Sequence, residues 1–471
     1  MKKLFGVFDF SFLKKLISKN TFRNSYILIT LILISLSFLI SLFASCDTTE
    51  PPNKLELTLK LEDVSCTEAW LQLTTNNIQL PATVNLIKND VQSEVFVLNT
   101  KDSLLYIDSL LPNQSYKFLA TMQSSSNASN ELSVTTMDTT SHNFTWQTFT
   151  FGEHSSSTLF DVAIIDENNI WTVGEIYMND SLGNPDTKIY NAIHWNGSSW
   201  ELKRIQTLFR GNLITVPLEG IYAFTPTDIW MVGSLPIHGD GTNWTMYDLR
   251  TTVDPNLSLS KVWGSSSTDM YFAGNNGNIA HYQNGRWTKI ESGTTLNLTS
   301  VSGNIEDVYF SGVNSFTNEG ILLKYKSNIV SVIARGKIVG PNEVFNPFLY
   351  GEFQAICLLD RTILVGGNFL YQFHFSKWDY VKSLPENFVN GTPNSSIRGF
   401  IYSITANDMN DKIISGDGNT LLHFNGSSWL QLGEPYNPIS TISHRSTKIF
   451  NNIVVTVGYK GNKAMIMKLV R

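Results

Sequence analysis

Two long segments combine acidic and aromatic residues, and they are the candidate ligand-binding sites of this chain. One runs from Glu175 to Tyr190 between two predicted strands, and the other is an insertion over 336–351. Carboxylates beside aromatic rings suit a glycan or peptide ligand, because rings stack on apolar faces. Solvated surface loops have the same composition, so that alternative stays open. The candidate ligand-binding residues are Glu175, Tyr177, Asp180, Asp186, Tyr190, Glu343 and Tyr350.

Three histidines recur at the start of similar hairpins and could suggest a metal site. They are His194, His281 and His423, one in each of three repeated units. Ligands of one ion must converge to about 2.0–2.2 Å from it, whereas separate units hold their residues far apart. We therefore predict partly exposed histidines that cap the hairpins, with no metal site and no cofactor.

The sequence contains no motif of a known catalytic type. It lacks a nucleophile elbow, a His-Glu-x-x-His motif and paired cysteines, and its Gly-rich stretches at 274–277 and 416–419 lie between predicted strands, whereas a phosphate loop needs a following helix. We therefore predict no catalytic residue. Glycosidases need only two carboxylates about 5 to 10 Å apart, and such a pair leaves no sequence signature.

Composition excludes several classes of protein. The chain has 471 residues with a net charge of -6, and only 16% of them are charged, so no basic stripe is available for nucleic acid. The three cysteines, Cys46, Cys66 and Cys357, lie in separate segments and exclude a disulfide scaffold. We expect Cys66 and Cys357 to be small buried residues.

The candidate loops are held by a repeat that fills the last two-thirds of the chain. Each copy has an apolar strand, a turn with Asp or Asn, and a strand that ends in Gly; an Asn-Gly hairpin follows in several copies. Four strands every ~40 to 50 residues are typical of a propeller blade. The Gly-ended strands are Asn169–Gly174, Asp228–Gly233, Asp269–Gly274, Asp307–Gly312, Thr362–Gly366, Lys412–Gly416 and Ile453–Gly458.

These copies predict an all-β protein whose main domain is a seven-bladed β-propeller over 144–471. The last copy lacks its fourth strand, and the segment 145–151 precedes the first copy, so we expect this segment to close the ring. The pattern resembles the propellers of uncharacterised exported bacterial surface lipoproteins and, more loosely, kelch and Asp-box proteins. It departs from kelch, whose paired glycines occur only at Gly366-Gly367, and it lacks the Asp-box and WD signatures.

Residues 54–140 alternate apolar and polar side chains and predict a small β-sandwich. The stretch from Leu110 to Phe118 resembles the fibronectin type III signature around its tyrosine corner, with Tyr116 as the tyrosine and Trp70 in the place of the early core tryptophan. That resemblance implies a spacer or adhesive module. Trp70 and Tyr116 could equally be core residues with no further role.

The N-terminus predicts export and anchoring. Residues 1–45 have a basic start, an apolar run and small residues, which is the layout of a secretory signal. The end of this run, Leu42 to Cys46, resembles the lipobox of bacterial lipoproteins, which implies lipidation of Cys46 and a lipidated tether at 46–53. An uncleaved membrane helix is the alternative. Both place the rest of the chain in the cell envelope, outside the cytoplasmic membrane.

We therefore expect a membrane-anchored binding or interaction protein whose propeller recognises a glycan, a peptide or an envelope or surface protein. The alternative is a carbohydrate-active enzyme (a glycoside hydrolase, lyase or glycosyl transferase) that uses carboxylates on one propeller face. An assembly factor of an envelope complex is a third possibility. The fold does not choose among these functions, because propellers host both binding and catalysis.

Overall fold

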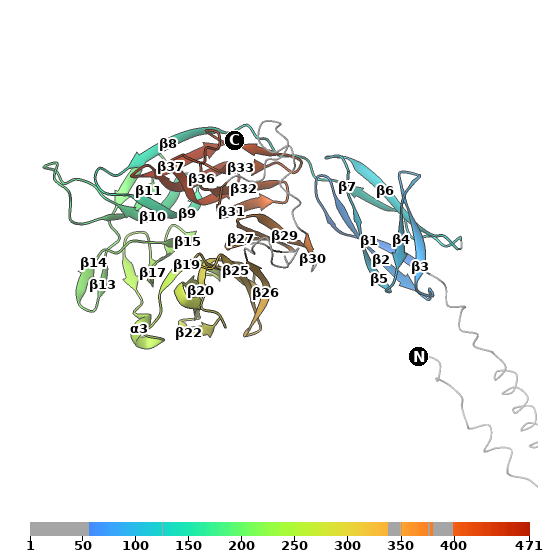
Figure 1. The fold of residues 1–471 in the computed structure, drawn as a ribbon, viewed down its shortest axis with the longest axis horizontal. Coiled ribbons are helices and arrows are strands. Elements are labelled where there is room, and N and C mark those ends of the chain that lie inside the picture. The colour runs from blue at the N-terminus through green and yellow to red at the C-terminus, as the bar shows by residue number, and fades with distance from the viewer. Residues whose placement is uncertain (1–55, 125, 338–348, 350, 375–376, 380–398) are drawn as a thin grey trace, which may run out of the picture.

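The computed structural model describes most of the chain after the predicted tether. The described residues are 56–471 without 125, 338–348, 350, 375–376 and 380–398. They form a small sandwich followed by a larger ring of sheets (Figure 1). Among them no helix is long and apolar enough to span a membrane. The predicted signal, the tether and Cys46 lie outside the described residues.

The sandwich consists of two antiparallel sheets, with strand orders β1-β2-β5 and β4-β3-β6-β7. Its strands alternate inward and outward residues, so Leu57 and Leu59 of β1 meet Leu71 and Leu73 of β2 in one core. The strands are β1 (Glu56–Val64), β2 (Ala69–Asn76), β3 (Ala82–Lys88), β4 (Val91–Leu98), β5 (Asp102–Ile107), β6 (Ser115–Met122) and β7 (Leu132–Thr135).

Trp70 does not belong to the core of the sandwich, contrary to expectation. Leu71 and Leu73 point inward, and because side chains alternate along a strand, Trp70 lies on the opposite face of β2. It is nevertheless buried, at 5% exposure, because its ring packs 4.5 Å from the ring of His374 in the following domain. Tyr116 behaves differently: its Oη accepts a 2.8 Å hydrogen bond from the backbone N–H of Leu111.

Seven four-stranded antiparallel sheets follow within the described residues, here called sheets 1 to 7. Sheet 1 is β9 (Thr158–Asp166), β10 (Asn169–Ile176), β11 (Tyr190–Trp195) and β12 (Trp200–Lys203); sheet 2 is β15 (Gly220–Thr225), β16 (Asp228–Gly233), β17 (Leu235–Gly239) and β18 (Trp244–Met246). Sheet 3 is β19 (Leu259–Ser266), β20 (Asp269–Gly274), β21 (Asn278–Gln283) and β22 (Arg286–Glu291); sheet 4 is β23 (Asn297–Gly303), β24 (Val308–Asn314), β25 (Glu319–Lys326) and β26 (Ile329–Lys337).

The remaining sheets complete the series. Sheet 5 is β27 (Phe353–Leu359), β28 (Thr362–Gly367), β29 (Leu370–His374) and β30 (Lys377–Asp379); sheet 6 is β31 (Ile401–Asp408), β32 (Asp411–Gly416), β33 (Leu421–Phe424) and β34 (Trp429–Gln431). Sheet 7 is β35 (Ile442–Phe450), β36 (Ile453–Lys460), β37 (Lys463–Val470) and β8 (Thr145–Phe151). Elements outside this pattern are β13 (Thr207–Phe209), β14 (Asn212–Ile214), α3 (Leu249–Thr252) and η1 (Asn275–Gly277).

The sheets close into a β-propeller. The first strands of consecutive sheets contact one another in the order β9, β15, β19, β23, β27, β31 and β35, and β35 contacts β9 again. Side chains reinforce this closure, since Ser446 Oγ donates to Asp161 Oδ1 over 2.6 Å and the backbone N–H of Ile221 donates to Asp161 Oδ2 over 3.1 Å. Strand β8 pairs with β37 over its whole length, which ties the start of the ring to its end.

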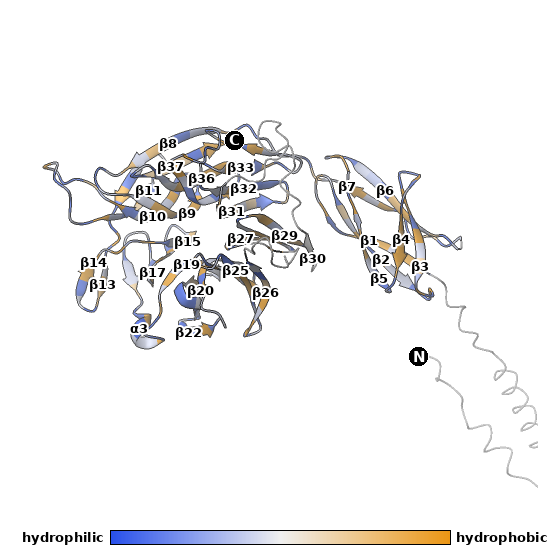
Figure 2. Cartoon of the chain, viewed as in Figure 1, coloured by the Kyte–Doolittle hydropathy of each residue, from blue (hydrophilic) through white to orange (hydrophobic). Residues whose placement is uncertain are grey.

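The recurring glycine is explained by the packing of each second strand against the start of the first. A Cβ at Gly274 would lie 2.1 Å from the carbonyl oxygen of Ser258, and one at Gly416 would lie 1.9 Å from that of Phe400. In sheet 5 the corresponding residue is Gly367, 1.9 Å from the oxygen of Glu352, one position after the glycine expected from sequence. The second strands of sheets 3, 5 and 6 are buried along almost their whole length, and most of their residues are apolar. Figure 2 shows the hydropathy along the chain.

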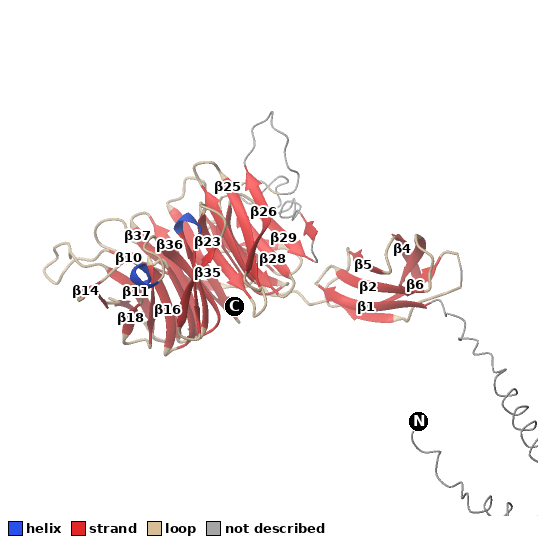
Figure 3. Cartoon of the chain, turned by 90° about the horizontal axis from the view of Figure 1, so that it is seen from below, coloured by secondary structure: helices blue, strands red, loops and turns tan. Residues whose placement is uncertain are grey.

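Antiparallel strands alternate in direction, so the connections of the propeller fall on two faces. The turns between first and second strands and between third and fourth strands lie on one face, here called the turn face. Connections from second to third strands and from one sheet to the next lie on the opposite face, here called the loop face. The sandwich lies beside one side of the ring (Figure 3). The first predicted binding loop, from Glu175 to Tyr190, is the connection from β10 to β11 and therefore belongs to the loop face.

Candidate functional site

The β10–β11 connection on the loop face holds its own acidic residues in hydrogen bonds. Asp180 Oδ1 accepts from the backbone N–H groups of Leu182 and Asn184, both over 2.9 Å, and so closes the tip of the loop. Asp186 accepts from the N–H of Lys188 over 2.9 Å and also pairs with Arg204. The bond from Lys188 and the pairing with Arg204 lower the pKa of Asp186.

Tyr190 also has a partner within the same sheet. The guanidinium of Arg204 lies 3.9 Å from the centre of the Tyr190 ring, at cation–π distance. Tyr190, Asp186 and Arg204 therefore form one cluster that supports the loop. A ligand at these residues would have to bind at their remaining exposed surface.

Glu175 and Tyr177 lie nearer the centre of the ring, at the end of β10. Tyr177 Oη donates to Glu175 Oε2 over 3.3 Å, and the backbone N–H of Tyr177 donates to Ser157 Oγ over 3.0 Å. The ring of His154 meets the ring of Tyr177 edge-on at 5.8 Å. The two predicted residues are thus brought together and held against the connection from β8.

Two further polar residues, Glu219 and Lys261, lie beside this pair. The backbone N–H of Leu218 donates to the oxygen of Gly174 over 3.2 Å, which places Glu219 next to the end of β10. Lys261 Nζ donates to the backbone oxygen of Glu219 over 3.2 Å. Glu175, Tyr177, Glu219 and Lys261 are here called the inner-rim cluster.

Burial raises the pKa of Glu219; the Lys261 ammonium opposes this rise, and the Glu175 carboxylate adds to it. Glu219 is exposed to water on one side, and the protein that surrounds it on the other sides accounts for the desolvation. The cluster therefore offers a carboxyl with a raised pKa, a second carboxylate, a phenol and an ammonium. Such a set can bind a polar ligand by hydrogen bonds, or transfer a proton to it.

Sequence analysis missed Glu219 and Lys261 because it considered only the long connections. Glu219 directly precedes β15, the first strand of sheet 2, and Lys261 lies near the start of β19 in sheet 3. The first strands line the centre of a propeller, so polar residues at the starts of these strands could have been predicted to lie there. That prediction requires the order of the strands within each sheet, which the repeat alone does not supply.

The other predicted residues cannot be placed. Glu343 and Tyr350 of the second loop lie outside the described residues, as does Cys46. The described end of that loop shows a buried carboxyl, Glu352, which accepts a 3.3 Å hydrogen bond from Ser315 Oγ. Burial raises the pKa of Glu352, while the bond from Ser315 acts in the opposite direction.

The predicted role of the hairpin histidines is wrong in two of three cases. His281 and His423 are 7% and 0% exposed, because each Nε2 pairs with the aspartate at the start of the second strand of its sheet. These aspartates are Asp269, at 2.7 Å, and Asp411, at 2.9 Å. Both pairs have a spacing of 12 residues, which was a sequence signal for the contact.

His194 is half-buried and makes the corresponding contact with Asn169, over 2.9 Å. His238, which sequence analysis did not single out, pairs with Asp228 over 2.8 Å. Each of these pairs links the second and third strands of its sheet. Among the described residues, no group of three or more His, Cys, Asp or Glu residues could hold a metal ion.

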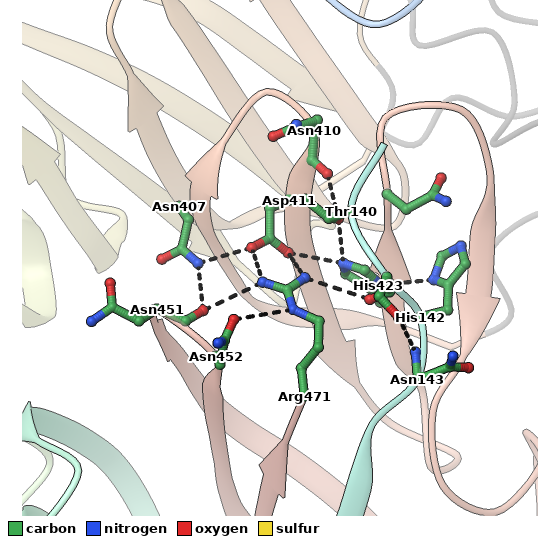
Figure 4. Close-up of polar contacts among 12 residues, drawn as sticks. Thr140, His142, Asn143, Asn407, Asn410, Asp411, His423, Asn451, Asn452 and Arg471 are labelled. Atoms are coloured by element: carbon green, nitrogen blue, oxygen red, sulfur yellow. Dashed lines mark hydrogen bonds and ion pairs between the residues drawn. The ribbon is translucent and has the colours of Figure 1, made fainter. Parts of the chain in front are cut away.

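A buried polar cluster joins the linker before the propeller to sheets 6 and 7 (Figure 4). Arg471 donates to both carboxylate oxygens of Asp411, over 3.0 and 2.7 Å, and His423 Nε2 donates to the same carboxylate over 2.9 Å. His142 Nδ1 lies 2.7 Å from His423 Nδ1, so one ring donates to the other. Burial favours the neutral acid of Asp411, but the bonds from His423, Arg471 and Asn407 lower its pKa to about 2.

Cys66 of the sandwich contacts the linker, since its Sγ donates to the backbone oxygen of Asp138 over 3.1 Å, whereas Cys357 lies in β27 of sheet 5. Cys66 and Cys357 are free thiols; Cys66 is buried, and Cys357 is half-buried. Burial raises the pKa of each thiol to about 11, which leaves both protonated at neutral pH. The polar cluster and Cys66 therefore connect the sandwich and linker to the propeller.

Comparisons with known proteins found no family for this chain, but they found solved structures of low similarity. No family model matches the chain, and no curated protein matches it. A solved structure described as "YCF48 bound to D1 peptide" is 15% identical with a TM-score of 0.46, and it covers 69% of this chain and 97% of that one. The WD40 β-propeller domain of Doa1 is 11% identical with a TM-score of 0.39, and covers 69% of this chain and 97% of its own.

Proposed function

We propose that this protein is a non-catalytic binding protein whose propeller holds a glycan, a peptide or a partner protein at the inner-rim cluster. The observation that carries the proposal is the convergence of Glu175, Tyr177, Glu219 and Lys261 from three adjacent sheets at the centre of the loop face. A closed ring fixes these groups before a ligand arrives, so little ordering has to accompany binding.

In this proposal the seven sheets are the blades of a seven-bladed propeller, and the sandwich is a fibronectin type III-like spacer. Two observations support the spacer assignment. The strand orders β1-β2-β5 and β4-β3-β6-β7 divide the strands three to four, and Tyr116 Oη accepts a bond from the backbone five residues upstream, as a tyrosine corner does.

We also propose that Cys46 carries the lipid that anchors the protein in the cell envelope, with the propeller outside the cytoplasmic membrane. The support is the sequence of 1–46, in which basic, apolar and small residues precede the cysteine. Incorporation of labelled palmitate into the wild-type chain, and its loss in Cys46→Ala, would test this anchor. Equal labelling of the two chains would contradict it.

The function is tested by screening the full-length protein against glycan and peptide arrays, with product analysis of every hit. We expect binding without new products, weakened about tenfold in Glu219→Gln because a hydrogen bond to a charged group is lost. The matched control is Glu201→Gln, since Glu201 is an exposed carboxylate of β12 that pairs with Lys203 over 2.7 Å. Equal weakening by both variants would overturn the proposed site.

A second function, that of a carbohydrate-active enzyme, is favoured by one observation. Glu175 and Glu219 are close enough for their charges to interact, and the pKa of Glu219 is raised by burial and by Glu175. A glycosidase uses such a pair, with the carboxyl of raised pKa as the general acid. Release of reducing sugar by the wild type and its loss in Glu219→Gln would replace binding with catalysis as the conclusion.

A further inference from the structure

The sandwich packs against the turn face of the propeller at sheets 5 and 6. Its Trp70 ring packs against His374 of β29, and its Glu62 carboxylate pairs with Arg361 over 2.7 Å in the turn before β28. Cys66 reaches sheet 6, where a Cβ added to Gly426 would lie 2.2 Å from its Sγ. At this place, here called the groove between sheets 5 and 6, the sandwich thus presents an aromatic ring and a carboxylate to the propeller.

An equivalent groove lies between sheets 3 and 4 on the same face. Strand register establishes the correspondence: Gln283 lies opposite the first residue of β20, Asp269, just as His374 lies opposite the first residue of β28. On the other wall, Tyr325 lies opposite Val308 as Phe424 of sheet 6 lies opposite Lys412. The two grooves are therefore built from the same positions of the repeat.

The groove between sheets 3 and 4 contains a cavity of about 380 Å³, within the range of ligand-binding pockets. Gln283, Val308 and Tyr325 all line it. Its only aliphatic residues are Val308 and Ile305, and Ile305 is 89% exposed. The rest of the lining is aromatic, amide, hydroxyl or charged, so the cavity suits a partner that brings both a ring and polar atoms.

Two cationic side chains line this cavity, and they differ in whether they form ion pairs. Lys326 pairs with Asp307 over 3.0 Å and with Glu306 over 3.5 Å. Arg286, the first residue of β22, is exposed and has neither a side-chain hydrogen bond nor an ion pair among the described residues. Its position near the end of β21 resembles the place of Arg361 near the end of β29, where Arg361 binds a carboxylate of the sandwich.

We propose that the groove between sheets 3 and 4 is a second docking site, which receives an aromatic side chain flanked by carboxylates on a segment of another protein. The ring would pack beside Tyr325 and Gln283, and a carboxylate would pair with Arg286. The occupant is not the sandwich of a second copy, because the Trp70 and Glu62 side chains are already engaged within their own chain. This site lies on the face opposite the inner-rim cluster.

The test uses full-length protein and two matched sets of 12-residue fluorescent peptides. One set has a central Trp flanked by Asp and Glu, and in the other Lys replaces the acidic residues. We expect the acidic set to bind more tightly, and Arg286→Glu to weaken that binding at least about tenfold by replacing an attraction with a repulsion. Arg335→Glu is the control, because Arg335 of β26 is also exposed and makes no ion pair among the described residues.

A second variant, Ile305→Asp, changes the cavity itself and should weaken the binding of the acidic peptides. Ile305 lines the cavity and is exposed, so its replacement should leave folding intact while adding a carboxylate that repels the acidic peptides. Equal binding of the two peptide sets, or equal weakening by Arg286→Glu and Arg335→Glu, would overturn the site. Glu219→Gln should leave peptide binding here unchanged, so failure of this site and failure of the inner-rim site are separate results.

Discussion

At the scale of single residues, Asp411 is the most heavily engaged carboxylate of the junction. It is 3% exposed and receives hydrogen bonds from Arg471, His423 and Asn407. We expect Asp411→Asn to lower the free energy of unfolding by about 3–5 kcal/mol, because it leaves the Arg471 charge uncompensated in a buried site. Urea denaturation measures this loss. Glu201→Gln, at an exposed ion pair, should change stability by less than about 1 kcal/mol, and a similar loss in both would contradict the prediction.

The lowered pKa values of two histidines predict how the stability of the protein depends on pH. Burial lowers the pKa of His444 to about 4; burial, His423 and Arg471 lower that of His142 to about 4. In the unfolded chain the pKa of a histidine is about 6.5, so the unfolded state takes up protons first as the pH falls. Stability should therefore be full above pH 6.5 and decrease down to about pH 4.

Urea midpoints between pH 7 and pH 4 measure this decrease. His142→Gln should make the decrease shallower, because it removes one of the two protonation sites while an amide still offers Ser428 a hydrogen-bond partner. His154→Gln is the control, since His154 lies on the loop face. If the urea midpoint falls equally steeply with pH in His142→Gln and in the wild type, His142 does not contribute to the pH dependence of stability.

At the scale of strands, the recurring glycine has a direct test. In Gly274→Ala and Gly416→Ala the new methyl groups would clash with backbone oxygens at 2.1 and 1.9 Å, and a backbone cannot move away as a side chain can. We expect each variant to lose about 1–3 kcal/mol of stability, measured by urea denaturation. Ser331→Ala, an exposed change in β26, should be neutral. Stability like that of the wild type in both glycine variants would refute the packing explanation.

Much of the strand pattern could be predicted, because each strand carries its own signal. Alternation in β1 and β2, the buried run of β28 and the Asn-Gly hairpins are local properties of the chain. Trp70 was misplaced because alternation tells which residues share a face, but not which face meets another domain. The Asp269–His281 pair and the neighbours of Glu175 depend on register and on strand order, which local pattern does not give.

At the scale of the whole molecule, the sandwich is fixed to the propeller by its own contacts and by those of the linker that follows it. Glu62 pairs with Arg361 before it, and Asn410 Nδ2 donates to the backbone oxygen of Asp138 over 2.7 Å within it. The linker also joins Arg471, the last residue of the chain, through a 3.5 Å bond to the oxygen of Ser141. Domain docking and closure of the ring thus share one cluster.

Charge reversal tests this docking. Glu62→Arg and Arg361→Glu should each increase the distance between spin labels on the sandwich and the propeller, because each places like charges together at the interface. The double variant should restore the wild-type distance, since it rebuilds the pair in the opposite sense. Lys203→Glu, at a surface pair away from the junction, should leave the distance unchanged. If the double variant remains open, the Glu62–Arg361 pair is incidental, and docking depends on the Trp70 contact and the linker instead.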